Sequence, residues 1–543
     1  MTLRRAVAGR LAAVEPMEPR RLLASAPVTF GSTLNDGVFG IETLADGSSV
    51  IVGTFGGTVD FQPGSAVTAL TSKGQSDVFV ARYSARGKLL WAGQMGGGGG
   101  RVNDEPLFSP VTATIGDFIN KTGPAPNRQG EYVTSLEVRG DVIYIGGAFQ
   151  ATADFDPGPG VFNRRSAGYH DAFVVRLNVD DGSLINALTF GGPFDDAVKD
   201  LAVTADGNVI ATGLFTREAD FNPFSAVTQR PASGRDDIFV ASYSPSGRLV
   251  WLYTAGGDAV DLSERDAGES VALDSAGNVY VTGTFSGRAD FDPSDGRLFI
   301  ENEDKTDGFL LRLSPRGKLD YVKSFGGDEF DGGGNLAIDA ADRLYLSGYF
   351  AEEVNLNLNG PAMVFTAREE DDSRDDNDDD EGIDSFDLFL GQYSLTGQAN
   401  WIRQIGGDDY ELLGQMEVDD QGVLFSGSFA GTIEFYGVTT ASTLRSVAGD
   451  DDFDDDGDRE SSYDAFVARY STAGGFVAAQ KIGGNGDDWG NTISVNQSRG
   501  AVGFGGIFRN TASFALDGSG QNVRSNGLQD GFLLALDLAA DLT

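Results

Sequence analysis

Short apolar stretches in which hydrophobic and polar residues alternate follow one another along almost the whole chain. Residues 269–275, 278–285, 307–314 and 318–327 show the pattern clearly, with turn residues between them. A period of two predicts half-buried β-strands, because successive side chains of a strand point to opposite faces of its sheet. No helical period interrupts these units, so we expect an all-β chain.

The pattern of four strands recurs seven times, and we call the strands of each copy A, B, C and D in chain order. Strand B always closes on Gly-x-Phe, and another apolar residue stands six positions beyond the Phe. An even spacing keeps both side chains on one face of an extended chain. Four-stranded antiparallel units repeated radially predict a β-propeller, in which each unit is one blade. The strand-B phenylalanines are Phe55, Phe149, Phe215, Phe285, Phe350, Phe429 and Phe508.

The seventh copy lacks a strand D after its strand C, which begins at Asp530. Residues 26–37, near the other end of the chain, match the end of a strand D and the turn that follows it. Because an unpaired strand edge favours aggregation, we predict that this N-terminal segment supplies the missing strand. The predicted fold is a single seven-bladed β-propeller of four-stranded antiparallel blades over residues 27–543, closed by the N-terminal strand that completes the last blade.

Charge and composition narrow the expected partners. The formal net charge is −41, with 81 Asp and Glu residues against 40 Lys and Arg, so the protein repels polyanions and attracts cations. We therefore expect no nucleic-acid partner, no membrane insertion and a monomer. The chain has no Cys and one His, His170, which removes Ser-His-Asp and Cys-His catalysis unless His170 itself serves. Any metal site must use oxygen ligands.

The amino-acid sequence of the units resembles a known repeat. Residues 274–293 and 237–257 are similar to the SBBP-type β-propeller repeat of secreted and surface bacterial proteins, and the likeness extends from residue 27 to 540. The resemblance implies a β-propeller outside the cell or on its surface. It implies no particular reaction, since the family is defined by its repeat.

The first 26 residues form a segment apart, basic on an otherwise acidic protein. Residues 17–23 (MEPRRLL) resemble the LEPR-x-LL motif near the N-termini of exported planctomycete proteins, with Met17 in place of the usual Leu. Ala24-Ser25-Ala26 is similar to a small-residue cleavage site. We interpret residues 1–26 as an export segment that is disordered or removed; the alternative is a disordered basic tail that takes no part in export.

Three insertions, at residues 98–130, 367–386 and 446–463, all fall on the face where the B–C and D–A connections emerge, which marks the expected working face. The third has the alternating carboxylates of a D-x-D-x-D-G calcium loop, with Gly457 at the sharp turn. Tyr463 stands where the pattern calls for a bidentate Glu, so the last ligand would be an Asp. The alternative is a solvated acidic run. The predicted calcium ligands are Asp452, Asp454, Asp456, Asp458, Glu460 and Asp464.

Two further sets of carboxylates repeat around the ring. One stands near the entry to strand A, and such a ring at the channel mouth would bind a cation or a polyhydroxylated ligand; the alternative is that these residues cap turns. The other set precedes every strand C, where repetition in all seven copies predicts a shared hydrogen bond to backbone N–H groups. The channel-mouth candidates are Asp36, Asp196, Asp266, Asp331 and Glu411, with Glu131 and Asp488 slightly out of register.

The sequence favours a non-enzymatic extracellular propeller with no catalytic residues, a binding or surface scaffold for an unidentified glycan or protein, with calcium as the candidate cofactor. The alternative is a propeller glycoside hydrolase or lyase that uses carboxylates on the loop face. Such an enzyme should interrupt the repeat with singular Arg, Tyr or His residues directed at the channel. We find no such set in the sequence.

Overall fold

The computed structural model is built from β-strands, and every element of its described residues is a strand. None of these elements is therefore a helix long and apolar enough to cross a membrane. The described residues are 27–62, 67–98, 130–224, 228–257, 265–292, 296–302, 305–368, 386–407, 409, 411–437, 441–453, 459–514, 522–538 and 542.

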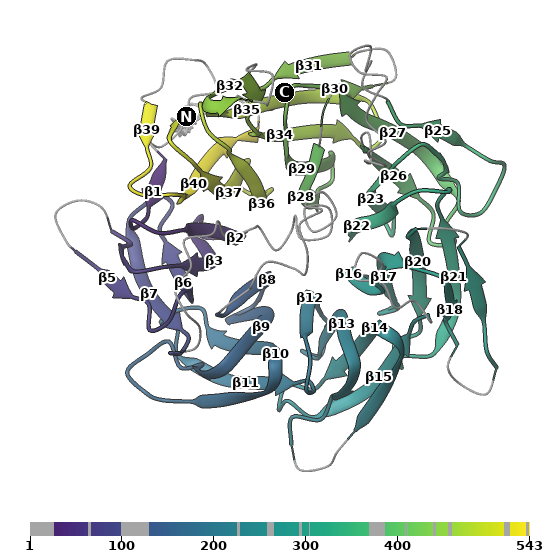
Figure 1. Cartoon of the computed structure of the whole chain (residues 1–543), viewed down its shortest axis with the longest axis horizontal. Helices are drawn as coiled ribbons and strands as arrows, with labels where there is room; N and C mark the ends of the chain where they lie inside the picture. Colours follow the sequence, from purple (N-terminus) through teal and green to yellow (C-terminus); the bar gives the residue numbers. More distant parts are fainter. Residues whose placement is uncertain are drawn as a thin grey trace, which may run out of the picture.

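Seven sheets stand around a central axis, and their four main strands pair antiparallel in the order A-B-C-D (Figure 1). This arrangement confirms the predicted seven-bladed propeller. Blades 1 to 3 are β2 (Asp36–Thr43), β3 (Ser49–Phe55), β6 (Asp77–Tyr83), β7 (Leu89–Met95); β8 (Tyr132–Arg139), β9 (Val142–Asp154), β10 (Asn163–Asn178), β11 (Leu184–Phe190); and β12 (Asp196–Val203), β13 (Val209–Asp220), β14 (Gln229–Tyr243), β15 (Leu249–Ala255).

Blades 4 to 7 follow the same order, with strand A innermost. They are β16 (Ala267–Leu273), β17 (Val279–Phe285), β20 (Asp307–Leu313), β21 (Leu319–Phe325); β22 (Asp331–Ile338), β23 (Leu344–Phe350), β26 (Asp387–Tyr393), β27 (Ala399–Gly407); β28 (Glu411–Val418), β29 (Gly422–Phe429), β34 (Asp464–Ser471), β35 (Phe476–Gly484); and β36 (Trp489–Asn496), β37 (Ala501–Phe508), β40 (Asp530–Asp537), β1 (Val28–Phe30).

The N-terminal strand closes the ring as predicted. β1 pairs antiparallel with β40, and Thr29 lies opposite Phe532. In Figure 1 the purple strand β1 lies beside the yellow strand β40. Phe30 is buried against Phe61 and Phe79 of blade 1, at ring-centroid distances of 5.0 and 5.3 Å. The closing strand therefore belongs to blade 7 by hydrogen bonding and joins it to blade 1 by packing.

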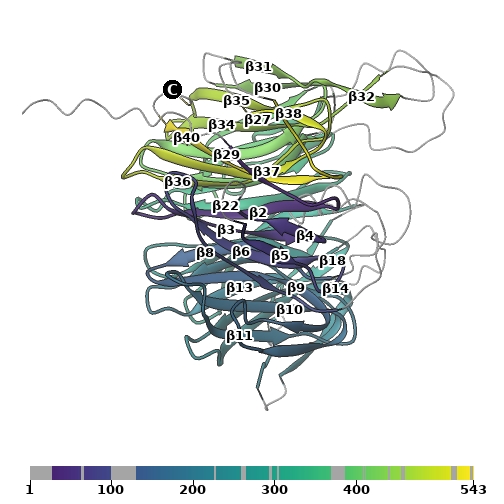
Figure 2. The ribbon, with the colours of Figure 1, turned by 90° about the vertical axis from the view of Figure 1, so that its left-hand side faces the viewer.

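The extra length between strands B and C forms hairpins that reach the preceding blade. Gly96, after β7, bridges Asp154 of blade 2, and Gly191 bridges Asp220 of blade 3 in the same way. Figure 2 shows the hairpin strands β4, β18 and β32 on one side of the ring. The hairpin strands are β4 (Thr58–Asp60), β5 (Ala69–Thr71), β18 (Arg288–Asp290), β19 (Phe299–Glu301), β24 (Glu353–Asn355), β25 (Val364–Thr366), β30 (Thr432–Tyr436), β31 (Ala441–Arg445), β32 (Ala448–Phe453), β33 (Arg459–Ser461), β38 (Thr511–Ser513) and β39 (Asn522–Arg524).

The Gly-x-Phe signature has a steric cause. A β-carbon on Gly53 would overlap the carbonyl oxygen of Gly37 in strand A and would lie 2.7 Å from the Phe79 ring in strand C. The corresponding glycine of each of the other blades meets a strand-A carbonyl in the same way. Phe55 and Phe61, six residues apart, pack edge to face at 5.7 Å, as their spacing predicted. The glycine lets strand A approach, and the phenylalanines fill the blade interior.

Candidate functional site

A cavity of about 640 Å³ lies in the central channel. Its wall comes mainly from β2, β8, β12, β16, β22 and β28, the innermost strands of six blades. The pairing of each strand A with its strand B shifts register near its middle. Such a bulge changes the direction in which side chains point, so this interruption of the alternation helps to bring polar side chains to the channel wall.

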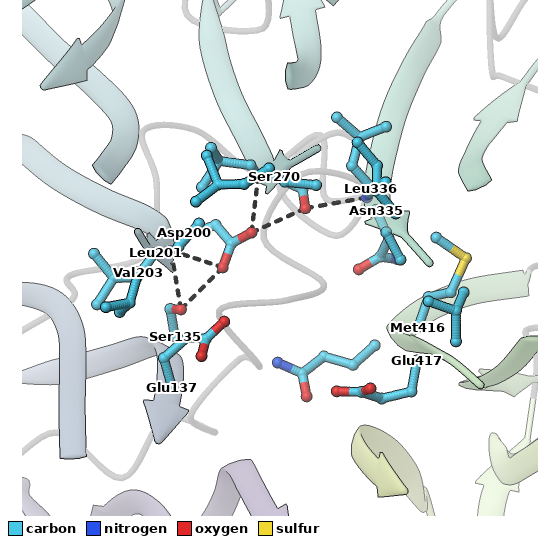
Figure 3. A pocket seen from close by; sticks show the side chains of 18 of the residues that line it. Ser135, Glu137, Asp200, Leu201, Val203, Ser270, Asn335, Leu336, Met416 and Glu417 are labelled. Carbon is cyan, nitrogen blue, oxygen red and sulfur yellow. Dashed lines mark hydrogen bonds between the residues drawn. The ribbon is translucent and has the colours of Figure 1, made fainter. Parts of the chain in front are cut away.

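Three glutamates stand at equivalent positions of strand A in three different blades. Glu42, Glu137 and Glu417 each stand six residues after the carboxylate that begins their strand pattern, and all three line the cavity. Figure 3 shows Glu137 and Glu417 pointing into the cavity from different blades. The other four blades carry a small residue at this position: Ala202, Ala272, Ala337 and Ser494.

The electrostatic environment of the three glutamates favours binding of positive charge. Desolvation and repulsion by neighbouring carboxylates raise the pKa of Glu137 to about 8 and that of Glu417 to about 7. Desolvation, then repulsion by Glu417 and Glu137, raises the pKa of Glu42 well above its usual range. All three side chains are partly exposed, because they face the cavity. A cation in the cavity would be attracted by the ionised glutamates and would reduce the repulsion among them.

An ion pair lines another part of the wall, on blades 3 and 4. Lys199 Nζ lies 3.3 Å from Glu269 Oε2, and both residues stand at the bulge of their strands. Tyr349 of β23 also lines the cavity. Lys199 and Glu269 stand three residues before the glutamate position of their strands. Strand A begins at the D–A connection, so the ion pair lies closer to that end of the channel than the glutamates do. Carboxyl groups therefore outnumber cationic side chains in this wall, where Lys199 and Arg139 are the two cationic side chains among the described residues, and the wall becomes more negative as the glutamates lose their protons.

A belt of hydrogen bonds fixes the channel wall between these two levels. Ser135 Oγ and Ser270 Oγ each donate to the carboxylate of Asp200 at 2.9 Å, and the backbone N–H of Leu201 donates back to Ser135 Oγ (Figure 3). The N–H of Leu336 donates to Ser270 Oγ at 3.1 Å. Burial raises the pKa of Asp200, and its hydrogen bonds oppose the rise. Asp200 thus joins three blades and is saturated by protein donors.

The belt continues through the remaining blades and stops between blades 1 and 2. Asn335 Nδ2 donates to Gly414 O, Thr492 Oγ1 to Gln415 Oε1, and the Ile41 N–H to Thr492 Oγ1. Blade 1 has Gly40 at the corresponding position, so it has no side chain to extend the belt. Six of the seven junctions are tied in this way at the level of the cavity.

Four of the five predicted channel-mouth carboxylates accept hydrogen bonds from backbone amides, and none of the five lines the cavity. Asp36 accepts hydrogen bonds from the N–H groups of Ser32 and Gly56, and Asp266 from those of Gly257 and Ser286. Asp196 accepts in the same way from the turn before strand A and the end of strand B. These side chains cap turns inside the blades. All five candidates are buried, namely Asp36, Asp196, Asp266, Asp331 and Glu411.

In six of the seven blades the aspartate that precedes strand C accepts backbone hydrogen bonds, as its repetition predicted. Asp77 accepts from the N–H of Lys73, Asp171 from Ala167, and Asp530 from Asn526. These carboxylates also press against the glycine that follows strand D, where a β-carbon would overlap them. The glycine that follows strand D is therefore required because any side chain there would overlap the neighbouring aspartate.

The structure describes only part of the predicted calcium loop. Asp454, Asp456 and Asp458 lie outside the described residues, and Asp452 and Glu460 are described only as backbone in β32 and β33. Asp464 is described fully at the start of β34, where its buried carboxylate accepts the N–H of Val447 and lies 2.8 Å from Lys481 Nζ. Within the described part of the chain, no group of three or more acidic or histidine residues is arranged to hold a metal ion. The calcium loop stays a prediction.

His170 lies within the long strand β10. Its Nδ1 lies 2.9 Å from Asp195 Oδ1, and it pairs with Gln150 of β9. The three channel glutamates were not among the candidates from the sequence. The signal that could have found them is the alignment of the strands A, in which one position is Glu in three blades and a small residue in the other four.

Fold and cavity together define the class of protein, a seven-bladed β-propeller repeat protein with a polar central channel. No family model matches the chain. An uncharacterised WD repeat-containing protein of Acanthamoeba polyphaga mimivirus is 28% identical over 167 residues, which are 28% of this chain and 11% of that protein. This chain thus spans a small part of the length of that relative.

Two similar solved structures are enzymes. The quinohemoprotein alcohol dehydrogenase of Comamonas testosteroni shares 10% sequence identity at a TM-score of 0.37, covering 94% of this chain and 76% of that one. The xylan β-1,4-xylosidase of Bacillus halodurans C-125 shares 10% at a TM-score of 0.24, covering 94% and 97%. At this level of similarity, nothing about activity is carried over to this chain.

Proposed function

We propose that this propeller is a non-enzymatic binding protein whose central cavity takes a small organic cation, such as an amine. The single observation that carries the proposal is the convergence of Glu42, Glu137 and Glu417 on the cavity from three blades. Compounds with one or two ammonium groups match both the negative wall and a cavity of about 640 Å³. The hydrogen-bond belt supports the proposal, because a rigid wall lowers the ordering cost of binding.

The test is calorimetric titration with putrescine, a diamine. Replacing any one of the three glutamates with Gln is expected to weaken binding about tenfold, the loss of one charge-assisted hydrogen bond. Glu301→Gln, on the exposed hairpin strand β19, is the matched control and should bind as the parent does. Affinity should rise from pH 6 to pH 8.5, because Glu137 and Glu417 lose their protons over that range. Equal binding by Glu137→Gln and the control would refute the proposal.

The export motif and the resemblance to the SBBP-type repeat support a place outside the cell or on its surface. There the acidic insertion at residues 446–463 would bind calcium and make the scaffold calcium-dependent. The same calorimeter tests this part separately, with calcium as titrant and a variant lacking residues 446–463. Equal heats from the two proteins would remove the calcium site and leave the channel proposal untouched.

A second function is favoured by one observation, the raised pKa values of neighbouring cavity carboxylates. A carboxyl that stays protonated near neutral pH is the general acid that a glycoside hydrolase needs, and a second carboxylate would complete the pair. A panel of glycosidase substrates distinguishes this function from simple binding. Turnover that is lost in Glu137→Gln and kept in Glu301→Gln would establish the enzyme.

A further inference from the structure

Two buried carboxylates stand at the starts of adjacent strands where the ring closes. Asp36 begins β2 of blade 1, and Asp530 begins β40 of blade 7. The backbone N–H of Asp36 donates to the carbonyl of Gln529 at 3.0 Å, which brings the starts of the two strands together. Both side chains are 1% exposed, and Asp530 contributes to raising the pKa of Asp36 by charge repulsion.

One oxygen of this pair lacks a well-aligned hydrogen-bond donor. Asp36 Oδ1 and Oδ2 accept the N–H groups of Gly56 and Ser32, and Asp530 Oδ2 accepts the backbone and side-chain N–H groups of Asn526. Asp530 Oδ1 is buried and makes no hydrogen bond of ordinary geometry, although the Gly527 N–H also acts on this carboxylate and lowers its pKa. It points to the turn at Gly31, where a β-carbon would overlap it. An ionised carboxylate with an unpaired buried oxygen is costly.

No cation offsets the two charges. Neither Asp36 nor Asp530 forms an ion pair with a lysine, arginine or histidine of the described residues. The groups that face them are the polar Ser32 and Asn526 and the backbone of β3, β37 and the closing turn. Two like charges in such a site cannot both be kept at low cost, so one carboxyl retains its proton.

We propose that the Asp36–Asp530 pair holds one proton at neutral pH, which makes the ring closure a pH-sensitive device that weakens when the proton leaves. Repulsion by Asp530 adds to the burial of Asp36, so a proton on either carboxyl relieves the pair. Neighbouring N–H donors already surround the site, which favours a proton over a metal ion as its occupant.

The same arrangement recurs at other junctions. A β-carbon on Gly191 would lie 2.6 Å from Asp196 Oδ2 and 2.9 Å from Asp171 Cγ, so both carboxylates flank that turn. At the junction of blades 6 and 7, Lys481 lies 2.8 Å from Asp464 and supplies the counter-charge that the closing junction lacks. The closure differs from that junction in having no lysine or arginine of the described residues paired with either carboxylate.

The direction of the pH effect follows from the folded-state pKa values. Burial raises the pKa of Asp36 to about 7 and that of Asp530 to about 6, above the value near 4 of an unfolded Asp. The folded protein therefore binds a proton that the unfolded chain releases between about pH 4 and pH 7. Over that window the unfolding equilibrium constant should rise up to tenfold per pH unit for this one proton.

The test compares thermal unfolding at pH 5 and pH 8 for the full chain and for Asp530→Asn. The amide mimics the protonated carboxyl, so the variant should lose less stability between the two pH values than the parent, and should match or exceed its Tm at pH 8. The control is Asp220→Asn, which removes a turn-capping carboxylate bound to the N–H groups of Asn222 and Thr228. It should shift Tm equally at both pH values.

Three outcomes would overturn the proposal. The first is an equal loss of Tm at both pH values for Asp530→Asn, as in the control. The second is a rise in the parent's Tm at pH 8 on adding calcium that Asp530→Asn does not show, which would make the occupant a metal ion. The third uses the parent alone and does not depend on a variant that folds: the absence, at pH 7, of an infrared band from protonated buried carboxyl groups.

Discussion

Phe30 offers the sharpest test of the ring closure, because it is the main apolar anchor of a strand of three residues. Its ring is 2% exposed and packs against Phe61 and Phe79 of blade 1, while its backbone pairs with Gly531 of blade 7. Phe30→Ala removes this packing and leaves a cavity, at an expected cost of about 3–5 kcal/mol.

The cost converts into a measurable change in melting temperature. An unfolding entropy of about 2.1 cal/mol/K per residue gives about 1 kcal/mol/K for a chain of this length, so Tm should fall by about 3–5 °C. Differential scanning calorimetry measures the fall. Deleting residues 1–34 should lower Tm further, since it also removes the pairing of Val28 and Thr29 with β40.

Phe224→Ala is the matched control, because that phenylalanine is 56% exposed and should change Tm by less than about 1 °C. A Phe30→Ala protein that melts together with the control would refute the reasoning. It would mean that the last blade is held without its N-terminal strand.

Two further changes test other parts of the ring. Arg469→Met should destabilise the protein by about 3–5 kcal/mol, because Arg469 and Asp419 form a buried ion pair at 2.9 Å and the change leaves Asp419 without its counter-charge; recovery of Tm in the double variant with Asp419→Asn would support this cause, and a single variant that melts like the parent would contradict it. Glu352→Gly should stabilise by about 1 kcal/mol, because Glu352 has a φ of 49° at a position where Gly57 and Gly431 stand in other blades. A lower Tm for this variant would show that the exposed glutamate contributes more than its backbone strain costs.

The sequence pattern predicted the fold because each repeated position answers a local requirement. Gly53 must admit a strand-A carbonyl, and Phe55 and Phe61 must share one face, so Gly and the first Phe recur in every blade and the second position is always apolar. The closure was predictable for the same reason: an incomplete unit at one end matched a fragment at the other.

The channel site was not predictable from those repeats. Glu42, Glu137 and Glu417 lie far apart in the chain, and their convergence depends on the bulge in strand A and on the curvature of the whole ring. The sequence predicted the repeated carboxylates as the binding residues, yet Asp36 and Asp266 accept hydrogen bonds from backbone amides of adjacent turns. Repetition in this protein marks structural needs, and departure from repetition marks the channel.

The pairing of β1 with β40 sets an order of events during synthesis. β1 leaves the ribosome before β40, and Gly531, the partner of Phe30, follows about 500 residues later, so at about 5–20 residues per second the pairing is delayed by roughly 25–100 s. Until then the aromatic interior of blade 1 is open on that side. Synthesis of β40, and not formation of any earlier blade, is therefore the step that closes the ring.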